Sequence, residues 1–150
     1  MKKVGYLIVI MMIGMSLQTA QAETSEFLGD MCLRADSSQT METFFDMRLG
    51  LTYVGGGHYA LHGMSIRPQG LGSAINGNAE IRSDNSIVMT LVNARKDDVE
   101  IRTTIFHIQF QSDGSGSYHS IKEVKVFGAS GITHDYDQGL VTFTLCEYPE

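Results

Sequence analysis

The sequence predicts an all-β domain, an antiparallel meander of seven or eight strands, because three observations agree. Apolar and polar residues alternate along several segments, which is typical of half-buried strands. Short stretches rich in Gly, Asn, Asp and Ser separate those segments and are suited to turns. Beyond residue 22, no helical periodicity extends over more than two turns. Connections this short favour pairing between consecutive strands.

The first half of the chain predicts a hairpin followed by a third strand. Residues 43–53 alternate apolar and polar side chains, and three consecutive glycines at 55–57 form a turn. Residues 58–66 make the returning strand of that hairpin. After a loop with Pro and Gly, residues 74–82 predict a strand that Gly77 weakens.

The next two strands are predicted at 87–93 and 99–110, joined by a polar turn at 95–98. Along 99–110 the apolar residues change phase, from odd positions to even ones. A β-bulge near Ile105 and Phe106 is the simplest interpretation, and it would bend the strand as a barrel wall requires.

The last strands are predicted at 117–127 and 140–147, with a polar loop at 128–139 between them. An eighth strand is expected at 31–35 if that segment pairs near the C-terminal strand. A meander of this length closes most readily as a small up-and-down barrel. The alternative architecture is a β-sandwich, and either arrangement removes exposed sheet edges.

The N-terminus predicts a secretory signal peptide. Lys2 and Lys3 precede an apolar run at 7–17, and Ala20-Gln21-Ala22 forms a cleavage site of small residues. We therefore expect cleavage after residue 22, a single mature domain at 23–150, and a periplasmic or secreted location. The run is shorter than the roughly 20 residues of a membrane span, and no second run follows. No membrane insertion is expected after cleavage.

The charge excludes one class of partner. The formal net charge of −6 becomes −8 when Lys2 and Lys3 leave with the signal peptide. Nucleic-acid binding requires clustered Lys and Arg, and the one adjacent basic pair, Arg95-Lys96, is followed at once by Asp97-Asp98. The sequence therefore indicates no nucleic-acid partner.

The two cysteines, Cys32 and Cys146, lie near opposite ends of the mature chain. In an oxidising compartment a single pair is expected to form a disulfide. A covalent link between the first and last elements is consistent with a closed architecture.

Strand count, hairpin order, signal peptide and terminal cysteine pair together resemble the calycins, the small barrels of lipocalins and avidins. The resemblance covers residues 43–147 and is one of architecture. The Gly-x-Trp motif of lipocalins and the tryptophan-containing aromatic box of avidins are missing, because the chain has no Trp. The resemblance implies a barrel that can enclose an interior cavity, and it transfers no ligand or binding residue to this chain.

The predicted function is non-catalytic binding of a small apolar ligand inside the barrel. Medium-sized and flexible apolar side chains occupy the strand faces, and methionines adapt to irregular apolar contents. Plain core packing is the competing interpretation. It leads to the alternative function, an envelope or extracellular interaction or inhibitor module with a packed interior and an exposed apolar patch. The residues expected to line the ligand site are Met47, Leu49, Tyr53, Met64, Met89 and Leu91.

No catalytic motif or metal-ligand spacing points to an enzyme, a cofactor or a metal. A third hypothesis, a small hydrolase or isomerase, would need a histidine and a carboxylate to converge in the barrel mouth. The segment containing His134, Asp135 and Asp137 offers oxygen ligands suited to Ca²⁺ but lacks a calcium-loop pattern. Whether it binds a cation or is a solvated acidic loop is left open.

Overall fold

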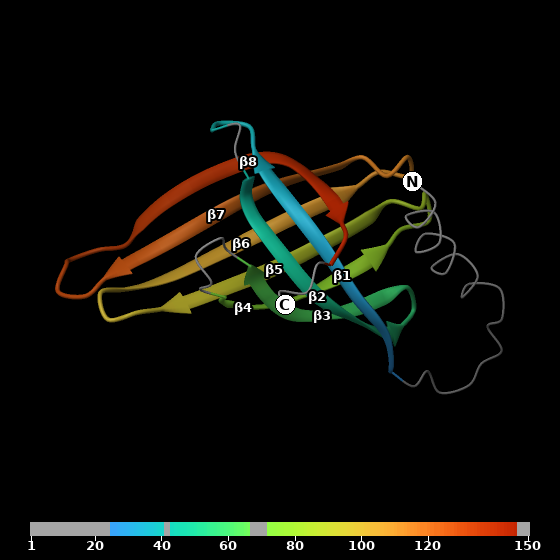
Figure 1. The fold of residues 1–150 in the computed structure, drawn as a ribbon, viewed down its shortest axis with the longest axis horizontal. Helices are drawn as coiled ribbons and strands as arrows, with labels where there is room; N and C mark the ends of the chain where they lie inside the picture. The colour runs from blue at the N-terminus through green and yellow to red at the C-terminus, as the bar shows by residue number, and fades with distance from the viewer. Residues whose placement is uncertain (1–24, 41–42, 67–71, 147–150) are drawn as a thin grey trace.

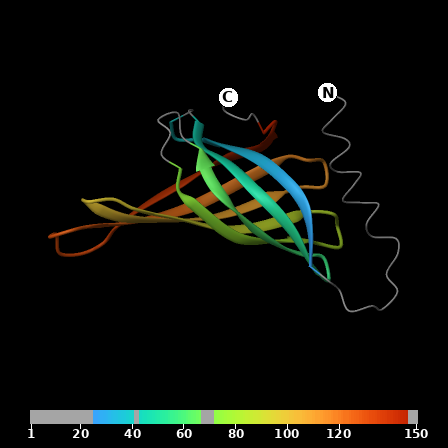
Figure 2. The same cartoon turned by 60° about the horizontal axis from the view of Figure 1, so that its bottom comes forward.

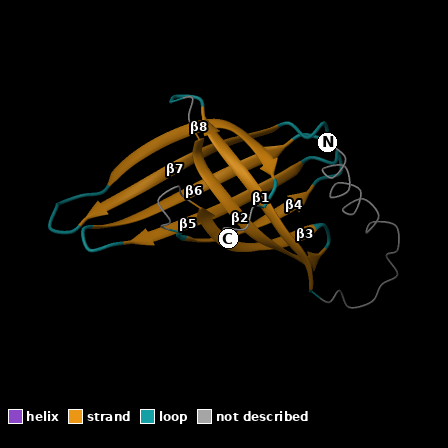
Figure 3. Ribbon diagram, viewed as in Figure 1, coloured by secondary structure: helices purple, strands orange, loops and turns teal. Residues whose placement is uncertain are grey.

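The computed structural model describes residues 25–40, 43–66 and 72–146, which form antiparallel strands joined by turns and loops (Figures 1 and 3). The predicted signal peptide, residues 1–22, lies outside the described residues. The strands are β1 (Glu26–Ser37), β2 (Thr43–Gly55), β3 (His58–Ile66), β4 (Ala74–Ile81), β5 (Ile87–Lys96), β6 (Glu100–Phe110), β7 (Gly116–Val126) and β8 (Thr133–Thr144).

Each strand pairs with the next one in the chain, and β1 pairs with β8 to close the ring. The antiparallel meander and its closure as a barrel are thus confirmed, and the alternative β-sandwich is not formed. The expected eighth strand at 31–35 is present as the central part of β1. Its closing register runs from Cys32 opposite Thr144 to Ser37 opposite Gly139.

The bulge predicted near Ile105 and Phe106 is wrong. β6 pairs with β5 and with β7 without any register shift. The change of phase arises because the outer face of β6 also carries apolar residues, including Ile101 and Ile105, while Phe106 and its even-numbered successors face inward. Two irregularities lie instead next to Gly29 in β1 and Gly55 at the end of β2, which both have positive φ, and a third lies between Ala35 and Asp36 in β1.

The prediction of a polar loop at 128–139 is wrong from residue 133 onward, because β8 begins at Thr133. Residues 133–139 pair in register with β7, for example Asp137 opposite Ser120. Backbone pairing with β7 outweighs the low strand propensity of this polar segment. At Gly139, a Cβ atom would clash with the carbonyl oxygen of Asp36, so the close approach of β1 and β8 there requires glycine.

The strands are unequal in length, and part of β5–β8 projects beyond the ring. β4 pairs with β5 only as far as Ala94, and β1 pairs with β8 only from Gly139 onward. Residues 95–104 and 122–136 therefore form a projecting four-stranded ribbon, visible at the left of Figure 1 and in the turned view of Figure 2. We call this segment the ribbon. Its inner face continues the barrel interior, and its outer face continues the outer barrel wall.

The disulfide between Cys32 and Cys146 is present, as predicted, with the two Cα atoms 5.3 Å apart. It joins β1 to the residues that immediately follow β8, on the outer side of the closing strand pair. The covalent link therefore secures the same pair of strands that closes the ring. A structural disulfide of this kind is typical of an oxidising, extracytoplasmic compartment.

Candidate functional site

The barrel interior contains four of the six predicted ligand-lining side chains. Met47, Leu49, Met89 and Leu91 point inward, are at most 1% exposed and belong to the single hydrophobic core. Tyr53 is partly buried at the edge of that core, where its ring packs 5.4 Å from the ring of Tyr59.

The prediction that Met64 lines the interior is wrong. Met64 lies on the outer face of β3 and is 55% exposed. The inward positions of β3 are the odd-numbered ones, including Leu61 and Ser65. Because side chains alternate strictly along a strand, an assignment that is off by one residue moves a side chain to the opposite face.

Side chains meet across the middle of the barrel. The rings of Phe45 on β2 and Phe106 on β6 are 5.1 Å apart, although these strands lie on opposite sides of the eight-stranded ring. Phe106 also lies 6.1 Å from the ring of Tyr118, and Phe110 stacks on Phe143 at 4.3 Å. An eight-stranded barrel is just wide enough for such filling. Phe45, Phe106 and Tyr118 therefore occupy the space at the centre of the barrel.

Buried polar groups close the core at the ribbon end of the barrel. Tyr118 donates a hydrogen bond to Asp137 at 3.0 Å, and Ser37 donates another to the same carboxylate at 2.8 Å. On the opposite wall, Asn93 donates to the hydroxyl of Ser73 at 2.7 Å. Hydrogen bonding of this kind satisfies groups that would otherwise be costly to bury. It links β1, β7 and β8 at one point, and at another it links β5 to Ser73, the residue that precedes β4.

This arrangement predicts a loss of stability at alkaline pH. Burial, reinforced by the hydrogen bond to the Asp137 carboxylate, raises the pKa of Tyr118 well above its ordinary value. In the unfolded chain the phenol ionises near pH 10, so the unfolded state loses its proton first. The free energy of unfolding should therefore fall as the pH rises past about 10, and continue to fall until the folded phenol ionises.

Urea unfolding between about pH 8 and about pH 11 would measure this dependence. Tyr118→Phe should flatten it, leaving the smaller contribution of Tyr59, whose pKa is also raised, by burial first. Tyr136→Phe is the control because Tyr136 is 67% exposed. An unchanged pH dependence in Tyr118→Phe would contradict the assignment.

The segment containing His134, Asp135 and Asp137 is a strand, and its side chains alternate between faces. His134 points outward and lies 3.2 Å from the Glu123 carboxylate. Asp135 pairs with Lys122 at 2.7 Å, which lowers the pKa of its carboxyl group. Asp137 belongs to the buried hydrogen-bonded group described above. Within residues 25–40, 43–66 and 72–146, no three His, Cys, Asp or Glu side chains converge as metal ligands.

The outer face of β5–β8 carries a row of apolar side chains that the sequence analysis did not identify. The residues are directly opposite one another across four successive strands: Val92 pairs with Ile105, Ile105 with Ile121, and Ile121 with Tyr136. Val92 is 39% exposed and Tyr136 is 67% exposed, while the two isoleucines are partly buried. We call these four residues the apolar row. With adjacent strands about 4.8 Å apart, the row is roughly 14 Å long.

A parallel row of polar side chains lies two residues away on each strand, on the side of the apolar row that is farther from the tip of the ribbon. In it, the rings of His107 and His119 stack with their centroids 4.9 Å apart, and Thr90 and Gln138 flank them. The signal for the apolar row was present in the sequence, since Ile105 is one of the residues that produced the apparent change of phase in 99–110.

The charge on this face differs from that of the whole chain. The outward strand residues of β5–β8 include Lys96 and Lys125 but only one acidic residue, Glu123, together with three histidines. The chain as a whole has a formal charge of −6. The outer face of β5–β8 is thus weakly cationic on an acidic protein.

The fold defines the class of this protein as an eight-stranded antiparallel meander barrel with a covalently linked closing strand pair. Comparison with family models, with curated proteins and with solved structures found no match to this chain. The predicted strand order and the β1–β8 closure are confirmed, and no family is identified. Among the described residues, no helix is long and apolar enough to cross a membrane.

Proposed function

We propose that this protein is a non-catalytic interaction module of an extracytoplasmic compartment, and that it binds a second, different protein through the outer face of β5–β8. The observation that carries the proposal is the apolar row on that face, together with side chains that meet across the barrel. An interior occupied by Phe45, Phe106 and Tyr118 favours recognition at the surface over a small apolar ligand at the centre.

The apolar and charged side chains of this face indicate the kind of surface that the partner would present. The apolar row would form the dry centre of an interface. His107 and His119 lie in the neighbouring row on one side, Glu123 and His134 in the neighbouring row on the other, and Lys96 and Lys125 one row beyond these. Such a surface is complementary to an apolar patch surrounded by Asp and Glu. A second copy of this chain is a poor occupant, because a symmetric dimer would place the same cationic groups against each other.

The size of the row favours a transient complex. A stable interface buries about 800 Å² on each partner. A row of four side chains roughly 14 Å long supplies only part of that area. We therefore expect a weak and transient association.

The first experiment identifies the partner by site-specific photo-crosslinking in the cells that produce the protein. A photoreactive amino acid in place of Tyr136 should yield one crosslinked product of defined mass. The same amino acid in place of Glu80, which is exposed on the outer face of β4, is the control and should not yield it. The identified protein is then purified, and its affinity for the mature chain is measured.

A pair of matched variants tests the face directly. Val92→Asp should weaken binding about tenfold or more by placing a carboxylate within the apolar row. Val54→Asp alters a valine of similar exposure, 47% against 39%, at the far end of β2, and should leave the affinity unchanged.

Three results would overturn the proposal. Equal loss of affinity in both aspartate variants would show that the face is not the contact. A dimer of the mature chain that Val92→Asp dissociates would assign the face to a second copy. An extra small mass in the native mass spectrum, lost on denaturation, would favour an apolar ligand inside the barrel instead.

A further inference from the structure

Two arginines face each other directly on the inner face of the ribbon. Arg95 on β5 is paired with Arg102 on β6, and the cross-strand row continues through Val124 to Thr133. Like charges placed directly opposite each other across a sheet are destabilising. Asp97 beside Arg95 and Glu100 beside Arg102 offset part of this repulsion.

The acidic neighbours of these arginines leave most of the guanidinium donors unused. Arg95 reaches Asp97 through a single nitrogen at 3.4 Å, and Arg102 is paired with Glu100 through its Nε atom. Asp97 is itself committed to its turn, because it accepts hydrogen bonds from the backbone of Val99 and Glu100, both at 2.9 Å. A guanidinium has five N–H donors. Within the described part of the chain, each arginine therefore has several donors with no protein acceptor.

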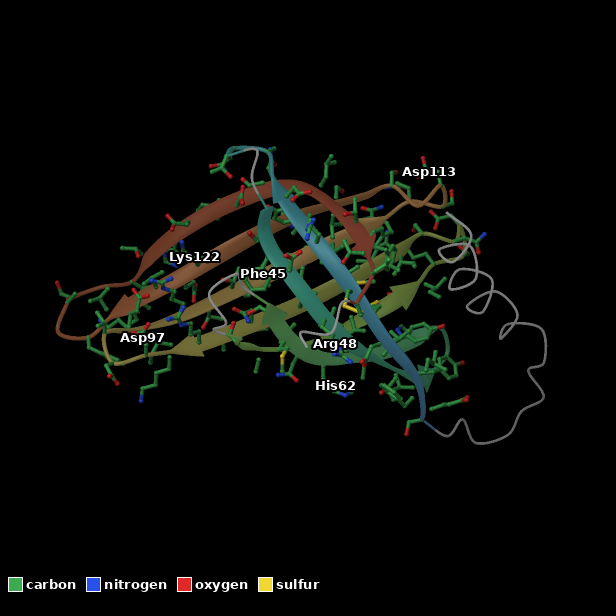
Figure 4. All side chains as sticks on the ribbon, in the orientation of Figure 1. Phe45, Arg48, His62, Asp97, Asp113 and Lys122 are labelled. Carbon is green, nitrogen blue, oxygen red and sulfur yellow. A yellow bond between two sulfur atoms is a disulfide. The ribbon has the colours of Figure 1, made fainter. Side chains whose placement is uncertain are left out.

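Both arginine side chains are partly exposed to solvent. The side chains of Arg95 and Arg102 are 25% and 38% exposed. Lys122, which lies one cross-strand row nearer the barrel, adds a third cation and is 32% exposed in its pair with Asp135. Figure 4 labels Lys122 on the ribbon and Asp97 at the turn beyond it. The inner face of the ribbon thus carries two partly exposed guanidinium groups at directly opposite positions, each with one acidic partner.

We propose that Arg95 and Arg102 bind an oxyanion, the phosphate or carboxylate group of a small molecule, with Lys122 at the margin of the site. Guanidinium groups match both oxyanions through paired N–H···O hydrogen bonds. An anion between the two arginines would accept hydrogen bonds from both and remove their repulsion. The site is on the face of the ribbon opposite to the apolar row, so it does not depend on the proposed protein partner.

The test is a nuclear magnetic resonance titration of the mature, disulfide-bonded protein with inorganic phosphate and, separately, with acetate, at ionic strength matched with chloride. Saturable shifts should appear at the side-chain Nε–H groups of Arg95 and Arg102 and at the amide of Val124. Tighter binding of phosphate would identify a phosphorylated ligand, and tighter binding of acetate a carboxylate.

Arg95→Gln is the informative variant, because it removes one guanidinium and leaves the pair of Arg102 with Glu100 intact. It should weaken the binding of the preferred anion about tenfold. Lys96→Gln is the matched control, since Lys96 is the next residue and points to the outer face. Its affinity for the anion should equal that of the parent.

Thermal unfolding provides a second measurement. In chloride, Arg95→Gln should melt close to the temperature of the parent, because the loss of the Arg95–Arg102 repulsion and the loss of the Arg95–Asp97 pair oppose each other. In phosphate or acetate, the parent should gain more in melting temperature than the variant. The proposal is overturned if neither anion produces saturable shifts, or if Arg95→Gln and Lys96→Gln weaken binding equally.

Discussion

Replacing both Cys32 and Cys146 with serine should lower the free energy of unfolding by about 4–5 kcal/mol. The two residues are separated by 114 positions, so the disulfide restricts nearly the whole unfolded chain. The native state should survive, because β1 and β8 remain paired from Cys32 opposite Thr144 to Ser37 opposite Gly139. The expected effect therefore arises in the unfolded ensemble rather than from lost native contacts.

Equilibrium urea unfolding of the double variant and of the oxidised parent measures this difference. The parent treated with a thiol reductant is the matched control and should unfold at the same urea concentration as the double variant. A difference between oxidised and reduced parent below about 1 kcal/mol would contradict the chain-entropy argument. It would mean that the unfolded chain is already compact or that the disulfide strains the folded one.

Phe106→Ala should destabilise the protein by about 3–5 kcal/mol. Phe106 is fully buried, and its ring contacts Phe45 on the opposite wall and Tyr118 on the neighbouring strand. Alanine would leave a cavity at the centre of the barrel, and strands held by hydrogen bonds on both sides cannot collapse to fill it.

Chemical unfolding of Phe106→Ala is to be compared with that of Ile101→Ala. Ile101 lies on the same strand but on the outer face and is 40% exposed, so its replacement should cost about 0.5 kcal/mol or less. Similar losses in the two variants would show that the interior is not the main source of stability. Binding of a small apolar molecule by Phe106→Ala alone would indicate that the ring occupies a space otherwise large enough for a ligand.

The face assignments that the sequence supported best are those where one face is apolar and the other polar. Along β2, Phe45, Met47 and Leu49 alternate with Asp46 and Arg48, and the structure places the apolar set inside. β6 lacks this contrast, because Ile101 and Ile105 make its outer face apolar as well. Periodicity alone cannot distinguish such a strand from one with a bulge.

Met64 is a second residue whose face could not be assigned from the sequence alone. Methionine is usually buried, but in β3 the inward positions include Leu61 and Ser65, and Met64 lies between them on the outside. The neighbouring strand fixes this choice, since β3 pairs with β2 through Leu61 opposite Leu51. Register between strands is a tertiary property that a single segment does not contain.

The residues of the two candidate surface sites are brought together only by pairing between strands. The apolar row joins residues from four strands, from Val92 to Tyr136, and the oxyanion site joins Arg95 to Arg102 across a turn. None of these residues forms a motif in the sequence. The acidic segment around Asp135 had the appearance of a loop, and only its pairing with β7 divided its side chains between two faces.

Strand class and strand order were thus determined by the sequence, because alternation, turn residues and short connections are local properties. The pairing of the two cysteines was also determined by the sequence, because the chain has only two. Closure of the ring, the inward or outward direction of residues in two-sided apolar strands, and the assembly of both surface sites were decided by the tertiary structure. The physical reason is that cross-strand register sets these features, and register follows from the simultaneous packing of all eight strands around one core.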